Sequence, residues 1–257
     1  MDKPTPTTGL AGEGSTHWYR PDGAPAYQIP AKNGELRNVT LRDARKLNLF
    51  PSVTTITRVA AAPGLEKWKR DQLLMSAMTL PAVPGESVDE YARRVQADAQ
   101  AQGEAARALG TQIHAEIEDA IRTGLTNPWT LPVLRWLDEN ILKRPWSPER
   151  SFSSPLGYGG KIDFHAPGVV IDFKTSDRVD DKTGGWDEQL MQLAAYASGL
   201  HEDLDTVIAG NLFVSTVEPG LLKWVQWTAA DLHRGFAMFE KLLEYWQLQK
   251  GYRPVTP

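Results

Sequence analysis

A short apolar run that ends in two charged side chains constrains this chain more than any other feature. Residues 169–171 (Val-Val-Ile) are consecutive β-branched or aliphatic residues, and such a run is typical of a buried strand. Asp172 and Lys174 continue it two positions apart, so their side chains point to the same face. Each charge is costly to bury without a partner or a metal. The fold must therefore place compensating groups beside this strand.

Other strand-like and helical segments surround this run. Residues 149–152 and 158–164 precede it, and Gly and Pro turns join the three runs as in an antiparallel meander. Two further strand-like runs occupy residues 207–214 and 222–227. Helical patterns cover residues 87–122, 132–142 and 229–250, with Gly103 and Gly110 as candidate breaks in the first. This order predicts an α/β fold with a mixed central β-sheet flanked by helices.

Composition limits the class of protein. Apolar residues make up 41% of the 257 residues and charged residues 23%, which is ordinary for a globular domain, and no apolar run is long enough to span a bilayer. Residues 1–16 contain Pro, Thr and Gly without a signal-peptide pattern, so we expect a disordered tail and a protein that stays in the cytoplasm. The absence of cysteine excludes disulfides, thiolate metal sites and iron–sulfur clusters. A net charge of −4 argues against coating of nucleic acid by a bulk positive field and leaves a local basic groove open.

A second acid precedes the charged strand. Asp163 lies on the preceding strand-like run, and a short Gly-containing turn would bring it beside Asp172. Mg²⁺ takes oxygen ligands and is usually held by one or two carboxylates, so this pair predicts a magnesium site in which Mn²⁺ would substitute. The backbone carbonyl of Thr175 is a further candidate ligand. Lys174 would orient or deprotonate an attacking water, or neutralise charge on phosphoryl oxygens, in phosphodiester hydrolysis.

The Asp-x-Lys spacing alone is a weak signal. Asp180 and Lys182 have the same spacing in what the sequence predicts to be a polar loop. For Asp172 and Lys174 the alternative is a strand-end ion pair, and Asp163 together with a following polar helix favours the catalytic interpretation.

The acidic pair, the lysine and that helix resemble a known family. The segments that carry the resemblance are Gly160-Lys161-Ile162-Asp163, Asp172-Phe173-Lys174 and Gln192-Leu193-Ala194-Ala195-Tyr196. They resemble the PD-(D/E)XK nuclease superfamily, in particular its RecB-like and lambda-exonuclease-like branch. Residues 110–114 with Glu118 are similar to the helix that carries a metal-proximal histidine in that branch. Residues 51–54 and 63–68 resemble the N-terminal region of phage exonucleases and mitochondrial genome maintenance exonucleases.

The resemblance implies a fold and an activity. The fold would be a restriction-endonuclease-like core with an N-terminal helical extension, in one domain over 17–257 that divides into the extension (17–85) and the catalytic core (86–257). The activity would be that of a Mg²⁺-dependent DNA exonuclease of phage or recombination and repair type, acting on single- or double-stranded DNA with free ends in the cytoplasm of a bacterial or phage-infected cell. A single-strand annealing or recombination protein as partner, and a homo-oligomer, are compatible with it, and contact with a membrane is not expected.

The resemblance also assigns roles to residues. Asp163 and Asp172 would bind the metal, Lys174 would assist catalysis, and Gln192 and Tyr196 would contact substrate or brace the site. His114 would lie near the metal, and Glu118 and Glu149 are further acidic candidates, although an ordinary helix histidine and a solvated strand start are the alternatives for His114 and Glu149. Two other functions stay open: a catalytically inactive nucleic-acid-binding protein with the same fold, and a site-specific endonuclease.

Overall fold

A five-stranded mixed sheet forms the centre of the molecule. The computed structural model describes residues 17–60, 63–141 and 147–256, so the tail expected over residues 1–16 lies outside the described residues. The strands are, in spatial order, β5 (Ser147–Ser154), β6 (Tyr158–Ala166), β7 (Val169–Ser176), β8 (Ile208–Ser215) and β9 (Leu222–Gln226). β5, β6 and β7 pair antiparallel, β7 and β8 pair parallel, and β8 and β9 pair antiparallel. The predicted meander and the mixed α/β sheet are both confirmed.

The central strand β7 is the apolar run with which the sequence analysis began. Val169, Val170 and Ile171 are fully buried, as expected of a strand covered on both faces. A two-residue connection that contains Gly168, at φ +75°, joins β6 to β7, and its positive φ is a conformation that glycine adopts at little cost. The connection brings the two acid-bearing strands together.

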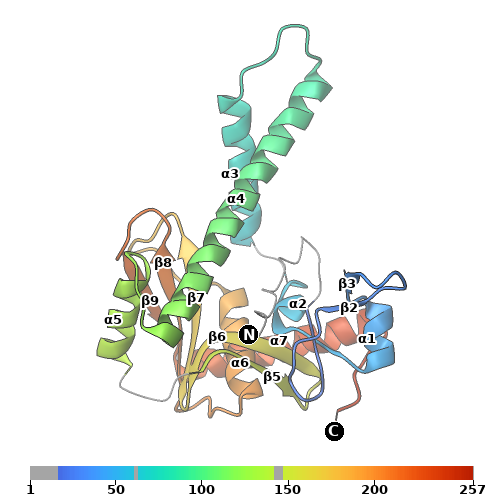
Figure 1. Ribbon diagram of the computed structural model, residues 1–257, viewed down its shortest axis with the longest axis vertical. Coiled ribbons are helices and arrows are strands. Elements are labelled where there is room, and N and C mark those ends of the chain that lie inside the picture. The colour runs from blue at the N-terminus through green and yellow to red at the C-terminus, as the bar shows by residue number, and fades with distance from the viewer. Residues whose placement is uncertain (1–16, 61–62, 142–146, 257) are drawn as a thin grey trace, which may run out of the picture.

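Helices cover both faces of the sheet (Figure 1). One face packs against α4 (Val88–Thr123) and α5 (Thr130–Asn140), and the other against α6 (Asp187–Gly199) and α7 (Ala229–Lys250). The apolar side chains that seal the first face include Ile113, Ile117, Val133 and Leu137, and those that seal the second include Leu190, Leu193, Leu232 and Phe239. α6 links the parallel strands β7 and β8 and packs on both of them, and its Gln192 reaches Lys174 at the polar end of β7.

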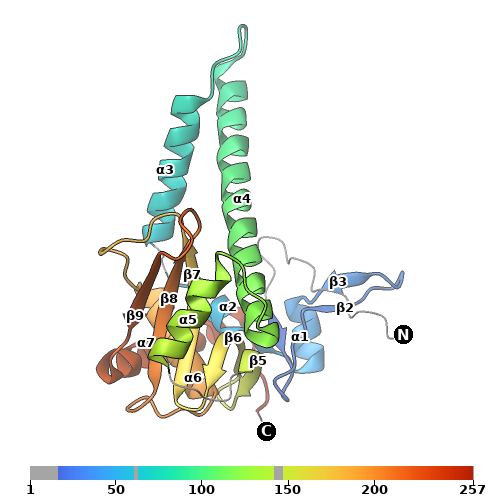
Figure 2. The same cartoon turned by 60° about the vertical axis from the view of Figure 1, so that its left-hand side comes forward.

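A long helical hairpin extends from the body. α3 (Pro63–Thr79) runs beside the outer part of α4, and both project away from the sheet (Figures 1 and 2). α4 continues through Gly103 and Gly110, so neither candidate break interrupts it, because each glycine costs only about 1 kcal/mol of helix propensity. The boundary we placed between residues 85 and 86 falls at the tip of this hairpin.

Short N-terminal elements precede the helical hairpin, and some of them pack beside β6. They are β1 (Trp18–Tyr19), β2 (Gln28–Pro30), β3 (Leu36–Asn38), α1 (Leu41–Leu47), β4 (Phe50–Pro51) and α2 (Val53–Thr57). β1 pairs with β4, and an isolated bridge joins Ser52 to Gly159 of β6. A Cβ atom on Gly159 would stand 2.7 Å from the Tyr19 side chain, so this close approach requires glycine.

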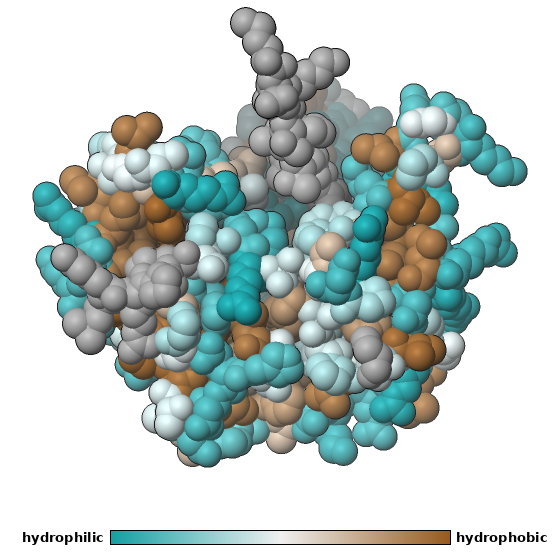
Figure 3. All heavy atoms as spheres, turned by 60° about the horizontal axis from the view of Figure 1, so that its bottom comes forward, coloured by the Kyte–Doolittle hydropathy of each residue, from teal (hydrophilic) through white to brown (hydrophobic). Residues whose placement is uncertain are grey.

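The face opposite the hairpin tip mixes hydrophilic side chains with scattered hydrophobic patches (Figure 3). No helix in the described ranges combines the length and the apolar character needed to cross a bilayer.

Candidate active site

The candidate site lies where β6 and β7 separate. Their ladder ends at the pair Phe164–Ile171, although both strands continue beyond it. Past this point the backbone N–H of Phe173 donates a hydrogen bond to Asp163 Oδ2 at 2.9 Å. The carboxylate thus replaces a strand neighbour as acceptor. This bond holds the Asp163 carboxylate against the backbone of the residue that follows Asp172. The binding of one cation by the two acids stays a prediction.

Asp172 is surrounded by hydrogen-bond donors. Its side chain is 4% exposed, and Oδ2 lies 2.7 Å from Lys174 Nζ and accepts a hydrogen bond from Asn211 Nδ2 at 2.8 Å. Oδ1 accepts from Gln192 Nε2 at 3.2 Å. A buried carboxylate is tolerated only when its charge and lone pairs are satisfied in this way. The groups that compensate the buried charge of Asp172 are therefore the Lys174 ammonium and the side-chain amides of Gln192 and Asn211.

Gln192 of α6 links the charged pair to Tyr196. Its Oε1 accepts a hydrogen bond from Lys174 Nζ at 3.2 Å, while Nε2 donates both to Asp172 and to the Tyr196 hydroxyl, the latter at 3.0 Å. Tyr196 is buried, and burial raises its pKa well above the ordinary value. The structure therefore brings Asp172, Lys174, Gln192 and Tyr196 into one network, with the last two in bracing positions.

A small recess opens on the α4 side of the same point. It is lined by His114, Glu118, Glu149, Asp163 and Phe173. His114 Nδ1 lies 3.6 Å from Asp163 Oδ2. Because Pro148 pairs with Phe164 and Arg150 pairs with Ile162, Glu149 lies opposite Asp163 across β5 and β6. His114, Glu118 and Glu149 are thus gathered around Asp163.

Two of the acids in this recess have basic partners of their own. Glu118 forms an ion pair with Arg122 one turn along α4, and Glu149 forms one with Lys161 on β6. Glu149 also has a φ of +55°, in the left-handed region that non-glycine residues seldom adopt. Residues with such strained backbone conformations cluster at functional sites.

Asp163 is the least compensated acid of the group. Burial raises its pKa to about 6; repulsion from Asp172 adds to that effect, and electrostatic attraction to His114 and Lys174 offsets only part of it. Burial alone would lower the pKa of Lys174, but the carboxylates of Asp172 and Asp163 outweigh it and raise that pKa. The carboxylate pair thus holds more negative charge than its surroundings neutralise.

The donor set fits an oxygen-seeking cation. Among the described residues, no three His, Asp or Glu side chains form a ready-made metal cage. Mg²⁺ does not require one, because it is usually held by one or two carboxylates with water and substrate oxygens completing its shell. A cation beside Asp163 and Asp172 would supply the charge that this pair lacks.

The other sequence candidates have clear positions. The Thr175 side chain faces α4, where a Cβ on Gly110 would stand 2.7 Å from its Oγ1, so it lies apart from the Asp172 network, and its backbone carbonyl stays a predicted ligand. Asp180, of the second Asp-x-Lys sequence, forms an ion pair with Arg178 at 2.7 Å in a loop, as expected of a surface segment.

Sequence reasoning missed Asn211 and its neighbour Trp227. Asn211 is fully buried on β8, and its Oδ1 accepts a hydrogen bond from Trp227 Nε1 at 3.1 Å. The available signal was a single amide residue within the apolar run 207–214, since a buried polar side chain needs partners.

Comparisons with known proteins add little to this geometry. No family model matches the chain, and none of the curated proteins is similar to it. Among solved structures, one match is the crystal structure of SSO0001, at 14% identity over 69% of this chain and 86% of that chain, with a TM-score of 0.27. A superposition of this quality supports no conclusion about fold or function.

Proposed function

We propose that this protein is a metal-dependent deoxyribonuclease with a restriction-endonuclease-like core, and more specifically an exonuclease of phage or recombination and repair type. The observation that carries the proposal is the hydrogen bond that holds the Asp163 carboxylate on the Phe173 backbone, between two members of the Asp172–Lys174–Gln192 network, where two strands part. An acidic pair, an ammonium group and a fixed amide at one point form the donor set that phosphodiester hydrolysis requires. Exonuclease action on DNA ends is supported by the sequence resemblance.

The residues would divide the work as follows. Asp163 and Asp172 would hold Mg²⁺, which supplies charge neutralisation at the phosphoryl oxygens and lowers the pKa of a coordinated water. Lys174 would place its ammonium beside the reacting phosphate and stabilise the charge that develops in the transition state. Gln192 would keep Lys174 and Asp172 at their present separation, and Tyr196 would hold Gln192.

A comparison of two lysine variants tests this proposal. Lys174→Ala removes the ammonium group beside Asp172, so we expect hydrolysis of end-labelled single- and double-stranded DNA to fall by about 10²- to 10³-fold, the loss typical of one electrostatic group. Lys182→Ala, in the loop with the same Asp-x-Lys spacing, is the matched control and should keep wild-type activity. EDTA should abolish hydrolysis by all three proteins.

Two outcomes would contradict parts of the proposal. If wild type and Lys174→Ala give the same products at the same rate, the site does not catalyse. If wild type binds DNA but never cleaves it, the protein is a non-catalytic binding protein with this fold. Closed circular DNA separates the remaining alternatives, because an exonuclease leaves it intact while an endonuclease linearises it.

A further inference from the structure

A polar relay runs from Asp172 through the interior of the protein to an indole ring. Asn211 is fully buried on β8, beside Asp172 in the parallel β7–β8 register. Its Nδ2 lies 2.8 Å from Asp172 Oδ2, and its Oδ1 lies 3.1 Å from Nε1 of Trp227, which directly follows β9. The three side chains come from three successive strand regions of the sheet.

The chemistry of the two end groups fixes the orientation of the amide. An indole N–H can only donate a hydrogen bond, so the Asn211 atom that faces Trp227 must be the oxygen. An ionised carboxylate can only accept, so the atom that faces Asp172 must be the amino group. The amide therefore has one orientation that satisfies both neighbours. Because Asn211 is fully buried, the opposite orientation of its amide would leave two unsatisfied contacts.

Trp227 itself is held by the segment that leads into α6. A Cβ atom on Gly185 would stand 2.0 Å from Cζ2 of the Trp227 ring, so only glycine allows the backbone to lie against the indole. Gly185 belongs to the connection between β7 and α6, the same helix that carries Gln192. The indole is thus enclosed between this connection and Asn211, and its N–H has a defined direction.

From these contacts we propose that Asn211 and Trp227 are positioning residues for Asp172. This inference rests on the proposed metal-dependent nuclease function. Trp227 orients the Asn211 amide, and Asn211 in turn fixes the Asp172 carboxylate so that its oxygens face the cation position. Partners of this kind behind a ligating carboxylate typically contribute about 10- to 100-fold to metal affinity.

The test removes the indole N–H and keeps the ring. In Trp227→Phe an aromatic ring still lies against Gly185, but nothing holds the Asn211 oxygen. We expect Mn²⁺ binding, measured by titration calorimetry on the full chain, to weaken by about 10-fold or more. The Mg²⁺ concentration for half-maximal DNA hydrolysis should rise equally, with kcat at saturating Mg²⁺ much less affected. Trp136→Phe is the matched control, because Trp136 packs on Trp224 away from the relay.

A second measurement is independent of the metal. The side-chain amide protons of Asn211 should exchange slowly with solvent in wild type and in Trp136→Phe, and much faster in Trp227→Phe, as observed by NMR. Asn211→Ser, which removes both bonds of the relay without adding charge, should reproduce the loss of Mn²⁺ affinity and serves if Trp227→Phe does not fold.

The outcomes separate the two proposals. If wild type binds Mn²⁺ and the variants Trp227→Phe and Asn211→Ser bind it equally well, the relay does not position Asp172 and the inference is overturned. Unchanged amide exchange in Trp227→Phe overturns it as well, whether or not a metal binds. If wild type takes up no cation and hydrolyses no DNA while the amide protons respond as expected, the proposed function fails and the structural relay stands.

Discussion

At the scale of single residues, the two central acids of the site differ in how many hydrogen-bond donors and positive charges offset their negative charge. Asp172 is satisfied by Lys174, Asn211 and Gln192, whereas Asp163 accepts one backbone hydrogen bond and lies 3.6 Å from His114. A partly buried carboxylate with too few positive neighbours destabilises the fold whenever it is ionised. Ionised Asp163 therefore lowers the stability of the fold, a cost that is common among residues of functional sites.

The raised pKa of Asp163 leads to a prediction about the metal-free protein. Its pKa is about 6 in the folded state and 3.8 in the reference state, so the folded protein binds more protons between these values. Its stability should then fall as pH rises through this window, by about 2 to 3 kcal/mol in total. Asp163→Asn removes this penalty and should raise the melting temperature at pH 8 in EDTA.

Circular dichroism melts at two pH values check this expectation. Near pH 4, where the Asp163 carboxyl of the folded protein is protonated, the advantage of Asp163→Asn should shrink towards zero. A variant that melts at or below the wild-type temperature at both pH values would show that the carboxylate is better compensated than its surroundings indicate.

Some of the candidate site residues could be identified from the sequence alone, and others could not. Asp172 and Lys174 stand two apart on a strand, and Gln192 and Tyr196 stand four apart on a helix, so each pair shares one face before any fold is known. Asp163 is identified from the short Gly-containing turn that joins its strand to that of Asp172. Asn211 and Trp227 lie far along the chain from Asp172, and only the parallel pairing of β7 with β8 brings the amide to the acid. No local pattern contains that contact.

At the scale of elements, α4 joins the site to the hairpin. Its inner part carries His114 and Glu118 into the recess, and its outer part packs on α3. Gly110 marks the place where α4 crosses β7, since a Cβ there would stand 2.7 Å from Thr175 Oγ1. Gly103, two turns earlier, would meet only the Trp68 ring at an ordinary 3.6 Å. A close contact therefore requires glycine at position 110, whereas the space around position 103 would accept a side chain.

Substitution of each glycine by alanine tests this difference. Gly103→Ala should stabilise the protein by about 0.5 to 1 kcal/mol, because it reduces backbone entropy in the unfolded chain without a clash. Gly110→Ala should lose this gain or destabilise, because Thr175 is stiff at χ1 and α4 must shift to accept a methyl group. Urea unfolding of both variants measures the difference, and equal stabilisation by the two would mean that the contact with Thr175 relaxes freely.

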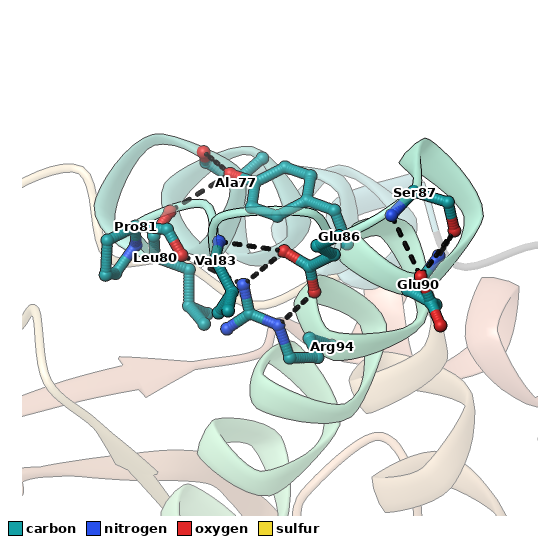
Figure 4. Close-up of polar contacts among 9 residues, drawn as sticks. Ala77, Leu80, Pro81, Val83, Glu86, Ser87, Glu90 and Arg94 are labelled. Atoms are coloured by element: carbon teal, nitrogen blue, oxygen red, sulfur yellow. Dashed lines mark hydrogen bonds and ion pairs between the residues drawn. The ribbon is translucent and has the colours of Figure 1, made fainter.

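At the scale of the whole molecule, the hairpin and the body differ in how they are stabilised. Of the described residues 64–109, only Ser76 and Val95 are buried, while Met78 and Val88 are 81% and 83% exposed. Polar contacts close the tip instead: Arg94 donates to Glu86 at 2.5 and 2.8 Å and to the Pro81 carbonyl at 2.9 Å (Figure 4). The periodicity of α4 predicted a helix correctly, but the sequence carried no signal that its outer half would lack a core.

Hydrogen exchange should report this division. Local opening needs little free energy where few apolar groups are buried, so amides of α3 and of the outer half of α4 should exchange faster than those of β7. Arg94→Ala should accelerate exchange further at the tip and leave the amides around Asp172 unchanged. Uniform protection across hairpin and sheet, by mass spectrometry at pH 7, would contradict this prediction.

The two-residue connection between β6 and β7 has a consequence for the order in which the protein assembles. Closing so short a loop is fast and loses little entropy, so Asp163 and Asp172 meet through an event that involves only residues 158–176. Gln192 and Asn211 come from more distant parts of the chain and arrive with α6 and β8, which depend on slower non-local pairing. The newly formed β6–β7 pair therefore carries Asp163 and Asp172 before the side-chain amides of Gln192 and Asn211, which fix Asp172, are in place.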